Sequence, residues 1–386
     1  EVHHILDKGI DHVNIDLAHH LGEIAQILFF LMGAMTIVEL VDAHQGFKMV
    51  TDRIQTKSKR KLLWITSWVT FFLSAILDNL TSTIVMISLL RKLVQDDNER
   101  KFFVGMVVIA ANAGGAWSPI GDVTTTMLWI GGQITPWNII EELFLPSVVS
   151  LAIPLIYVSF MLKGELDYSK LTYEPFENRR NSLIMLAVGL LGLIFVPVFK
   201  TLTHLPPYVG MLMSLSILWV VSEVLNSDKD EEERHYLSVS HALSKIDTSS
   251  ILFFLGILIA ISSLESTHVL RHLAEWMSAT IGNLDIIVIA IGLASAVIDN
   301  VPLVAATMGM YPLELYPTDH KIWEFLAYCA GTGGSVLIIG SAAGVAAMGM
   351  EKIDFFWYVK KVSFTALIGY FAGALTYLAV FYLLTH

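Results

Sequence analysis

The chain has 386 residues, of which 55% are hydrophobic and 15% are charged, and its formal net charge is −11. A mean hydropathy of +0.64, with apolar runs close to the roughly 20 residues that cross a bilayer, predicts a polytopic α-helical membrane protein. The lone Cys329 excludes an intramolecular disulfide, and the sequence has no GxxxxGK[ST] phosphate loop. We therefore expect a protein of the lipid bilayer that is not an enzyme, with no cofactor and no nucleotide or nucleic-acid partner.

In chain order, the first part of the sequence is expected to form one of two repeats. Residues 1–20 are polar and begin without a Met or a signal sequence, which indicates an external segment of a chain truncated upstream. The first repeat, 21–162, would contain crossings at 23–45 and 138–162, a re-entrant hairpin at 62–93 and a broken helix at 102–130. Residues 163–180 would form a cytoplasmic linker.

The remaining residues, 181–386, would form the second repeat in inverted orientation. Its expected crossings lie at 181–199, 205–225, 250–267 and 362–384, its hairpin at 284–311 and its broken helix at 322–349. Two helices precede its ILFFL motif, whereas none precedes the ILFFL of the first repeat. This difference is a second reason to expect helices upstream of Glu1.

Three recurring motifs indicate an internal repeat. ILFFL occurs at 27–31 and 251–255, SAILDN at 74–79 returns as SAVIDN at 295–300, and AGG at 113–115 corresponds to TGG at 332–334. The offsets are 224, 221 and 219 residues, and a period of this size is typical of secondary transporters built from two halves. The predicted fold is therefore an all-α inverted-repeat transporter with two re-entrant hairpins and two broken transmembrane helices.

The distribution of basic residues predicts the orientation in the membrane. Segments 47–61, 91–101, 163–180, 226–250 and 350–361 hold 20 of the 24 Lys and Arg residues, so they should be cytoplasmic. The hairpin 62–93 lies between two of them and would enter from the cytoplasm. The hairpin 284–311 has poorly basic flanks and would enter from outside. Opposed entry is what an inverted repeat requires.

Polar residues concentrate at the expected hairpin tips and helix breaks. An ionisable group in hydrocarbon costs about 2.5–3.5 kcal/mol even on the mildest scale, so Asp78 and Asp299 indicate a functional site. Carbonyl, hydroxyl and carboxylate oxygens suit a hard cation such as Na⁺ and not a transition metal. Besides the acids Asp78, Asp299 and Asp122, the candidate cation-binding residues are Asn79, Thr81, Ser82, Asn112, Ser118, Thr124, Thr125, Ser295, Asn300, Thr332 and Ser335.

Each acid also has a structural interpretation. Asp78 and Asp299 could cap the helices of their hairpins, and Asp122 could cap the second half of its broken helix, a role compatible with cation binding. Glu23 could lie on a proton path or simply begin a helix. Glu39 and Asp42 are expected to pair with basic residues at the membrane interface.

The stretch NAGGAWSPIGDVTTTMLW at 112–129, the SAILDN and SAVIDN pair, and the segment 20–47 resemble the NhaD-type sodium/proton antiporters of the ion transporter superfamily. The resemblance covers essentially the whole chain. It implies the inverted-repeat fold, assembly as a homodimer, and transport residues at Asp78, Asn79, Asn112, Asp122, Thr124, Thr125, Ser295, Asp299 and Asn300. Glu23 also matches the family pattern. The location expected with this resemblance is the bacterial inner membrane.

The leading hypothesis is exchange of cytoplasmic Na⁺ or Li⁺ for external H⁺, in which cation and proton compete for buried carboxylates. Burial favours the neutral form of a carboxyl group, so such a group can hold a proton near neutral pH. One alternative is a sodium-coupled anion or metabolite carrier with the same fold. The other is a membrane sensor or channel without coupled transport.

Overall fold

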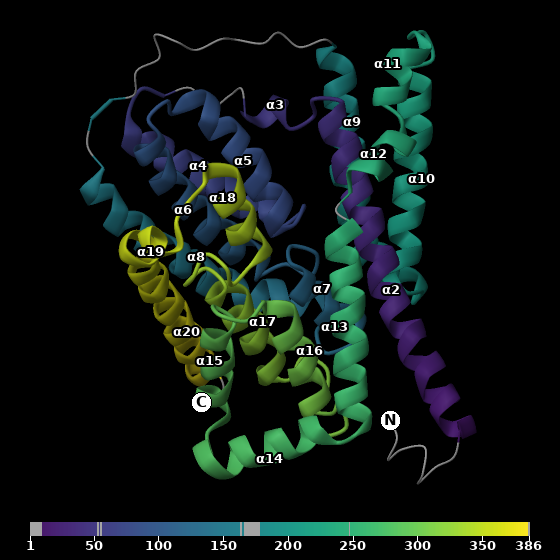
Figure 1. Cartoon of the computed structure of the whole chain (residues 1–386), viewed down its shortest axis with the longest axis vertical. Coiled ribbons are helices and arrows are strands. Elements are labelled where there is room, and N and C mark those ends of the chain that lie inside the picture. Colours follow the sequence, from purple (N-terminus) through teal and green to yellow (C-terminus); the bar gives the residue numbers. More distant parts are fainter. Residues whose placement is uncertain are drawn as a thin grey trace. The chain divides into compact units, whose positions relative to one another are not determined.

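The computed structural model describes residues 10–51, 54, 56–162, 164–165, 178–246 and 248–384. These residues are helical, apart from their connections and one antiparallel bridge between Ser58 and Glu165. The chain divides into two compact units (Figure 1). The first unit comprises Glu1–His20, Thr56–Leu171 and Ile257–His386, and the second comprises Leu21–Gln55 and Thr172–Gly256. Both predicted repeats contribute to each unit.

The first unit contains the segments predicted as hairpins and broken helices. Its helices are α4 (Lys59–Ser74), α5 (Asn79–Leu93), α6 (Asp97–Gly115), α7 (Val123–Ile130), α8 (Pro136–Met161), the later part of α13 (Thr248–Ser266), α14 (Val269–Ile281), α15 (Leu284–Ala294), α16 (Asn300–Met310), α17 (Lys321–Gly333), α18 (Ala342–Glu351), α19 (Phe355–Tyr358), the π-helical turn η1 (Val359–Ser363) and α20 (Phe364–Leu384). Helices α4 and α5, α6 and α7, α15 and α16, and α17 and α18 are each separated by a short break. Every break falls inside a segment for which the sequence predicts a hairpin or an interruption.

The second unit is built mainly from long apolar helices. They are α2 (Ile10–Ala43) from Leu21 onward, α3 (Lys48–Thr51), α9 (Arg179–Thr203), α10 (Pro207–Leu225), α11 (Glu231–Tyr236), α12 (Val239–Lys245) and the beginning of α13. Small residues bring α9 close to its neighbours. Ser214 Oγ of α10 donates to the Gly192 carbonyl of α9 at 2.9 Å, and Gly189 of α9 faces Val41 of α2.

Five helices among the described residues are long and apolar enough to cross a membrane: His20–Ala43, Pro136–Met161, Arg179–Thr203, Pro207–Leu225 and Phe355–Leu383. A sixth candidate is the pair Ile251–Ser266 and Val269–Ile281, which is bent by 74°. The backbone is left-handed at His268, where the bend occurs. The sequence analysis predicted the crossing at 250–267 but assigned no element to the residues of α14.

The helix pairs α6–α7 and α17–α18 of the first unit run in opposite directions. Glu351, at the end of α18, binds Arg91 at the end of α5 and Arg100 near the start of α6. The end of α7, by contrast, is tied to the loop before α17, where the Asp319 N–H donates to the Gln133 carbonyl at 2.8 Å. The end of each broken helix therefore lies beside the beginning of the other.

Candidate functional site

Four helices of the first unit begin at polar residues next to the breaks. The side chains of Asp78, Asp122, Asp299 and Ser341 cap α5, α7, α16 and α18. Each accepts a backbone N–H two or three residues ahead, at distances of 2.7 Å for Asp78, 3.2 Å for Asp122, 3.0 Å for Asp299 and 3.2 Å for Ser341. The capping role considered from the sequence therefore applies to all three acids. It leaves each carboxylate with further acceptor capacity.

A buried hydrogen-bond network joins these breaks around Asp122. Its Oδ2 atom accepts from Asn79 Nδ2 at 3.2 Å and from Asn300 Nδ2 at 3.1 Å. Asn79 Nδ2 also donates to Asn112 Oδ1 at 3.0 Å, and Asn112 Nδ2 donates to two serine hydroxyls at 2.9 Å. We call this group the Asp122 cluster: Asp122, Asn79, Asn112, Asn300, Ser335 and Ser341. It unites one polar residue or more from each break.

The charge of the Asp122 cluster is negative. Asp122 is 3% exposed, and within the described part of the chain no Lys or Arg lies within ion-pair distance of its carboxylate. Asp299 and Asp78 interact with it electrostatically and have the same sign. Removing a carboxylate from water without a cationic partner is costly, so such a group favours binding a proton or a cation.

Two hydroxyl groups near the cluster in the sequence are buried and without a partner. In the described residues, Thr124 Oγ1 and Ser82 Oγ have no hydrogen-bond partner. The Thr124 N–H is already bonded to Asp122 Oδ1. Gly331 packs beside the carboxylate, where an added methyl group would lie 3.8 Å from Asp122 Oδ2 and 3.3 Å from Ala116 Cβ. Unsatisfied hydroxyl oxygens and a carboxylate are a donor set that fits Na⁺ as substrate.

Other predicted ligands hold the breaks in shape. Ser118 Oγ donates to the Ala75 carbonyl at 2.5 Å, and Thr125 Oγ1 donates to the Asp122 carbonyl at 3.0 Å. Thr332 Oγ1 bonds to the Tyr328 carbonyl at 2.6 Å, and Thr81 Oγ1 donates to Asp78 Oδ2 at 2.8 Å. Each hydroxyl donates its proton to protein, and Ser118 Oγ also accepts from the Ile120 N–H at 3.4 Å. At least one oxygen lone pair stays available on each, and a role in cation binding stays a prediction.

Two contacts recur at matching positions in the two halves. Ser74 Oγ donates to the Ala111 carbonyl at 2.6 Å, and Ser295 Oγ donates to the Ala330 carbonyl at 3.0 Å. The same two serines approach a glycine of the neighbouring broken helix. A Cβ added at Gly121 would lie 2.7 Å from the Ser74 carbonyl oxygen, and one at Gly340 would lie 2.6 Å from that of Ser295. Both hairpin breaks therefore pack on a broken helix through one serine and one glycine.

Similarity to known proteins identifies the family of this chain. The Citrate transporter family (CitMHS) matches residues 8–322. Sodium/proton antiporter 1 of Arabidopsis thaliana is 57% identical over 95% of this chain and 64% of its own length, and sodium/proton antiporter 2 is 50% identical over 97% and 90%. The Na⁺/H⁺ antiporter NhaD of Alkalimonas amylolytica is 33% identical over 93% of this chain and 78% of its own.

The chain belongs to the NhaD-type sodium/proton antiporters, within the CitMHS family. This membership confirms the resemblance found in the sequence and makes the chain a transporter, not an enzyme. The chain spans about two thirds of the first relative's length, 64%, and nine tenths of the second's, 90%. The crystal structure of the Alcanivorax borkumensis YdaH transporter covers 97% of this chain and 89% of its own, with a TM-score of 0.57 and 12% identity. That likeness supports the fold alone.

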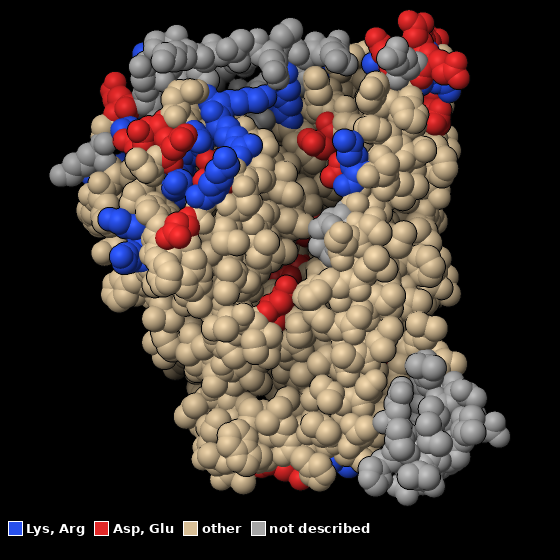
Figure 2. All heavy atoms as spheres, viewed as in Figure 1, with Lys and Arg blue, Asp and Glu red and all other residues tan. Residues whose placement is uncertain are grey.

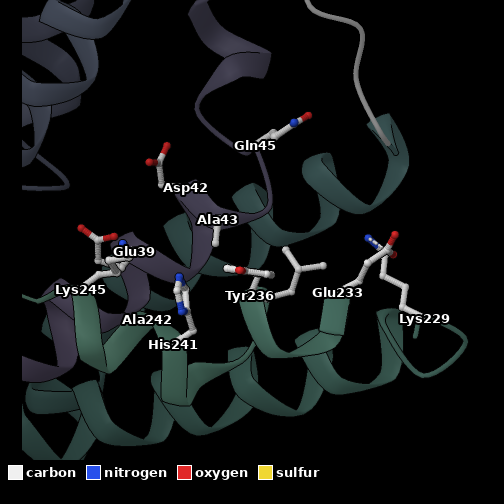
Figure 3. Close-up of a pocket in the computed structure, with 11 residues that line it drawn as sticks. Glu39, Asp42, Ala43, Gln45, Lys229, Glu233, Tyr236, His241, Ala242 and Lys245 are labelled. Atoms are coloured by element: carbon white, nitrogen blue, oxygen red, sulfur yellow. Dashed lines mark ion pairs between the residues drawn. The ribbon is translucent and has the colours of Figure 1, made fainter. Parts of the chain in front are cut away.

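Within this antiporter, Glu23 does not belong to the unit that holds the Asp122 cluster. It is exposed on α2 in the second unit, so its place on a proton path stays a prediction. The second unit has a polar pocket of about 440 Å³, but its charges are mixed (Figure 3). Glu39 lies close to Lys245 there, and the expected pairing of Glu39 and Asp42 with basic residues stays a prediction.

Two polar residues of the first unit, Ser341 and Glu324, were not predicted as site residues from the sequence. Ser341 was not among the predicted ligands, although it lies 219 residues after Asp122, the same offset as the AGG and TGG motifs. Applying that offset to every polar residue would have identified it as the counterpart of Asp122. Glu324 is an acid inside the predicted broken helix 322–349, and the rule applied to Asp78 would have selected it.

Proposed function

We propose that this antiporter exchanges cytoplasmic Na⁺ or Li⁺ for external H⁺ at the Asp122 cluster. The observation that carries the proposal is a buried carboxylate held by two amide groups and, among the described residues, by no cation. The two Arabidopsis relatives are named sodium/proton antiporters, which supports the same exchange here. Either bound species removes the cost of the buried charge.

The mechanism is competition for one site. With Na⁺ bound, Asp122 is ionised, and Asn79, Asn112 and Asn300 can turn amide oxygens toward the ion, because an amide group offers both donors and acceptors. With a proton bound, the carboxyl is neutral and the amides keep donating to it. Asp78 and Asp299 add negative potential that attracts a cation, and each is a further group that can carry a proton.

The inverted repeat with two re-entrant hairpins is the fold we propose for this exchange. The serine and glycine contacts of Ser74 and Ser295, 221 residues apart, support the equivalence of the halves. Helices α15 and α16 have 11 residues each. At about 1.5 Å per residue they reach only about half of a hydrocarbon layer roughly 30 Å thick, as a hairpin that turns back would.

The proposed orientation follows the basic residues. Figure 2 shows Lys and Arg, with some Asp and Glu, gathered over the end of the first unit where α5 ends and α6 begins, above a mostly uncharged surface. This end would face the cytoplasm, and the end with the start of α17 would face outward. The hairpins and broken helices lie in one compact unit, so they would move together during alternating access.

The proposed assembly is specific, whereas the proposed location is general. The chain is an integral membrane protein, and we propose the homodimer that the family resemblance implies. Two of the relatives are plant proteins, so they do not support the bacterial inner membrane expected from the sequence. We therefore propose a membrane location without assigning the membrane.

Transport of an anion is the alternative that the name of the matching family raises. Citrate would meet the carboxylates of Asp122, Asp78 and Asp299, and in the described residues no Arg or Lys side chain is bonded to the cluster to bind it. Like charges at the site oppose an anion by several kcal/mol at short range in a low-dielectric interior. The geometry favours a cation.

The decisive experiment uses purified protein in proteoliposomes that contain a pH dye. Sodium should change the internal pH, whereas potassium and citrate should not. Asp122→Asn should abolish the change, because an amide keeps the shape but cannot exchange a proton for a cation. Asp78→Asn and Asp299→Asn are expected to do the same. An Asp122→Asn variant with normal sodium response would remove the Asp122 cluster from the mechanism.

A further inference from the structure

Glu324 is a second buried acid that the exchange at Asp122 does not use. It lies in the first turns of α17 and is 1% exposed. Its Oε1 atom accepts from Asn138 Nδ2 of α8 at 2.8 Å. Its Oε2 atom is buried and, in the described part of the chain, has no hydrogen-bond partner. A buried carboxyl oxygen without a hydrogen-bond partner indicates that a proton or another ligand binds there.

No cation in the described residues balances this carboxyl group. Lys321, one turn earlier on α17, is bound to Asp285 at 2.7 Å and to Tyr382 at 3.0 Å. The charged groups that interact with Glu324 from neighbouring elements are Asp319 of the preceding loop and Glu142 of α8, and both are acids. From α20, Tyr377 faces it with a hydroxyl that donates to the Lys321 carbonyl at 3.2 Å. These surroundings oppose a fixed negative charge and favour a bound proton.

Helix α17 connects this acid to the Asp122 cluster. Gly331 follows Glu324 by seven residues, which returns to nearly the same face of a helix about 10 Å further along. It is the residue at which a methyl group would lie 3.8 Å from Asp122 Oδ2. Helix α17 also packs along α7, the helix that Asp122 caps. One face of α17 therefore leads from Glu324 to the carboxylate proposed to exchange.

We propose that Glu324 is an external proton-binding site that loads Asp122. The inference rests on the proposed function and adds a residue to it. Glu324 lies near the start of α17, at the end of the first unit opposite the Lys and Arg residues where α5 ends and α6 begins, so a proton from outside would reach it first. Bound there, the proton would pass toward Asp122 through water between α7 and α17, since about 10 Å is too far for direct transfer. Glu324 would then be ionised and able to bind another proton from outside.

The test is the dependence of sodium-driven exchange on external pH in oriented proteoliposomes. Glu324→Gln keeps an acceptor for Asn138 but cannot release a proton. It should lower the rate at least tenfold at alkaline external pH and flatten the external pH profile, while the half-saturating cytoplasmic Na⁺ concentration stays within about twofold. Glu324→Asp retains a carboxyl group but moves it by one methylene, so it should keep a pH-dependent profile with a shifted midpoint. The exposed Glu314→Gln is the matched control and should behave as wild type.

The outcomes separate this inference from the proposed function. A wild-type protein without sodium-driven proton movement would contradict the proposed function itself. Wild-type exchange with an unchanged external pH profile in Glu324→Gln would overturn only the role of Glu324. If Glu324→Gln fails to insert, Glu324→Asp decides: a profile whose midpoint and slope match wild type would overturn the proposal, and a shifted midpoint would support it.

Discussion

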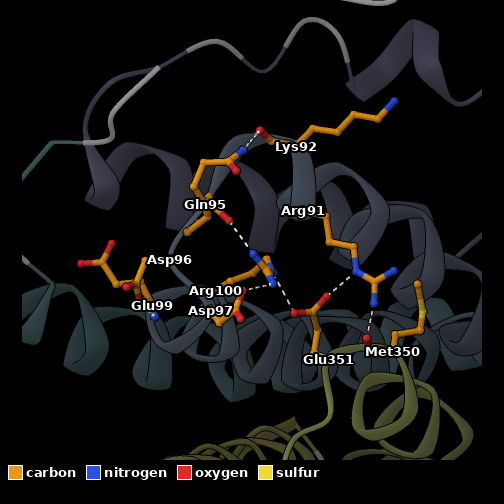
Figure 4. A network of polar contacts seen from close by, with 10 residues as sticks. Arg91, Lys92, Gln95, Asp96, Asp97, Glu99, Arg100, Met350 and Glu351 are labelled. Atoms are coloured by element: carbon orange, nitrogen blue, oxygen red, sulfur yellow. Dashed lines mark hydrogen bonds and ion pairs between the residues drawn. The ribbon is translucent and has the colours of Figure 1, made fainter. Parts of the chain in front are cut away.

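Helices α17 and α18 each carry one buried acid at the end remote from the Asp122 cluster, and the protein surrounds these two acids differently. The Glu351 carboxylate accepts hydrogen bonds from Arg91 Nε at 2.6 Å and from Arg100 Nε at 2.7 Å, one on each oxygen (Figure 4). Arg100 is held in turn by Asp97 at 2.6 Å and by the Val94 carbonyl at 2.8 Å. Glu324 has one amide donor and, among the described residues, no cation.

Burial alone therefore does not assign a role to a membrane acid. Two guanidinium groups bind Glu351, so its carboxylate joins the end of α5, the beginning of α6 and the end of α18 through ion pairs. An amide and two neighbouring acids leave Glu324 free to bind and release a proton. The same distinction separates Glu351 from Asp122. Partners, and not depth, decide whether a buried carboxylate supports structure or transport.

The largest expected effect is a difference in stability between matched variants. Glu351→Gln removes a buried charge that balances the largely buried guanidinium of Arg100, 13% exposed, and the exposed one of Arg91, 46% exposed, and should cost at most about 3–5 kcal/mol of unfolding free energy. Glu324→Gln replaces a group without a cationic partner and should change stability by less than about 1 kcal/mol. Thermal unfolding in detergent measures both. Equal losses in the two variants would contradict the distinction between the acids.

The matched control is Asp97, an exposed acid in the same ion-pair network as Glu351. Asp97 pairs with Arg100 but its side chain is 76% exposed, so Asp97→Asn should cost no more than about 1 kcal/mol. A loss as large as that of Glu351→Gln would mean that exposure does not reduce the strength of these pairs.

A smaller effect is expected at a buried histidine of the second unit, just after α2. His44 Nδ1 faces the Leu40 carbonyl at 2.8 Å and Nε2 faces Asn226 Nδ2 at 2.9 Å, which fits a neutral ring with its proton on Nδ1. Burial lowers the pKa of His44 below its usual 6.5. The unfolded chain then binds the proton more readily, so the contribution of His44 is full above about pH 6.5 and is lost as pH falls below that value.

Unfolding temperatures between acid and neutral pH would measure this contribution. His44→Gln should reduce the acid destabilisation, whose slope for one proton is at most about 1.4 kcal/mol per pH unit. The exposed His272→Gln should leave the slope as in wild type. A His44→Gln profile parallel to that of wild type would show that protonation of His44 is not coupled to folding.

The smallest expected effect compares the two halves. Ser74→Ala and Ser295→Ala each remove a buried hydroxyl that donates to a neighbouring helix, and each should cost about 0.5–1.5 kcal/mol. The exposed Ser88→Ala, whose hydroxyl bonds only within its own helix, should cost less. A loss confined to one of the two buried serines would weaken the proposed equivalence of the repeats.

Much of the helix pattern was predictable, because breaks in membrane helices need Gly, Pro and polar side chains that stand out in apolar sequence. Asp78, Asn112, Asp122 and Asn300 were identified for this reason. The hydrogen bonds among them were not predictable, since they join residues up to 229 positions apart, as between Asn112 and Ser341. Helix α14 was missed because its mixed polar and apolar residues lack a continuous apolar run.

Competition between Na⁺ and H⁺ for the Asp122 cluster is tested most directly by the pH dependence of sodium activation in wild-type proteoliposomes. If both ions occupy the same carboxylates, the half-saturating Na⁺ concentration should rise as pH falls, by up to about tenfold per unit for each proton displaced, while the maximal rate changes much less. Thr124→Ala and Asn112→Ala should raise that concentration at every pH without removing its pH dependence. A half-saturating concentration that stays constant from acid to alkaline pH would contradict competition at a shared site.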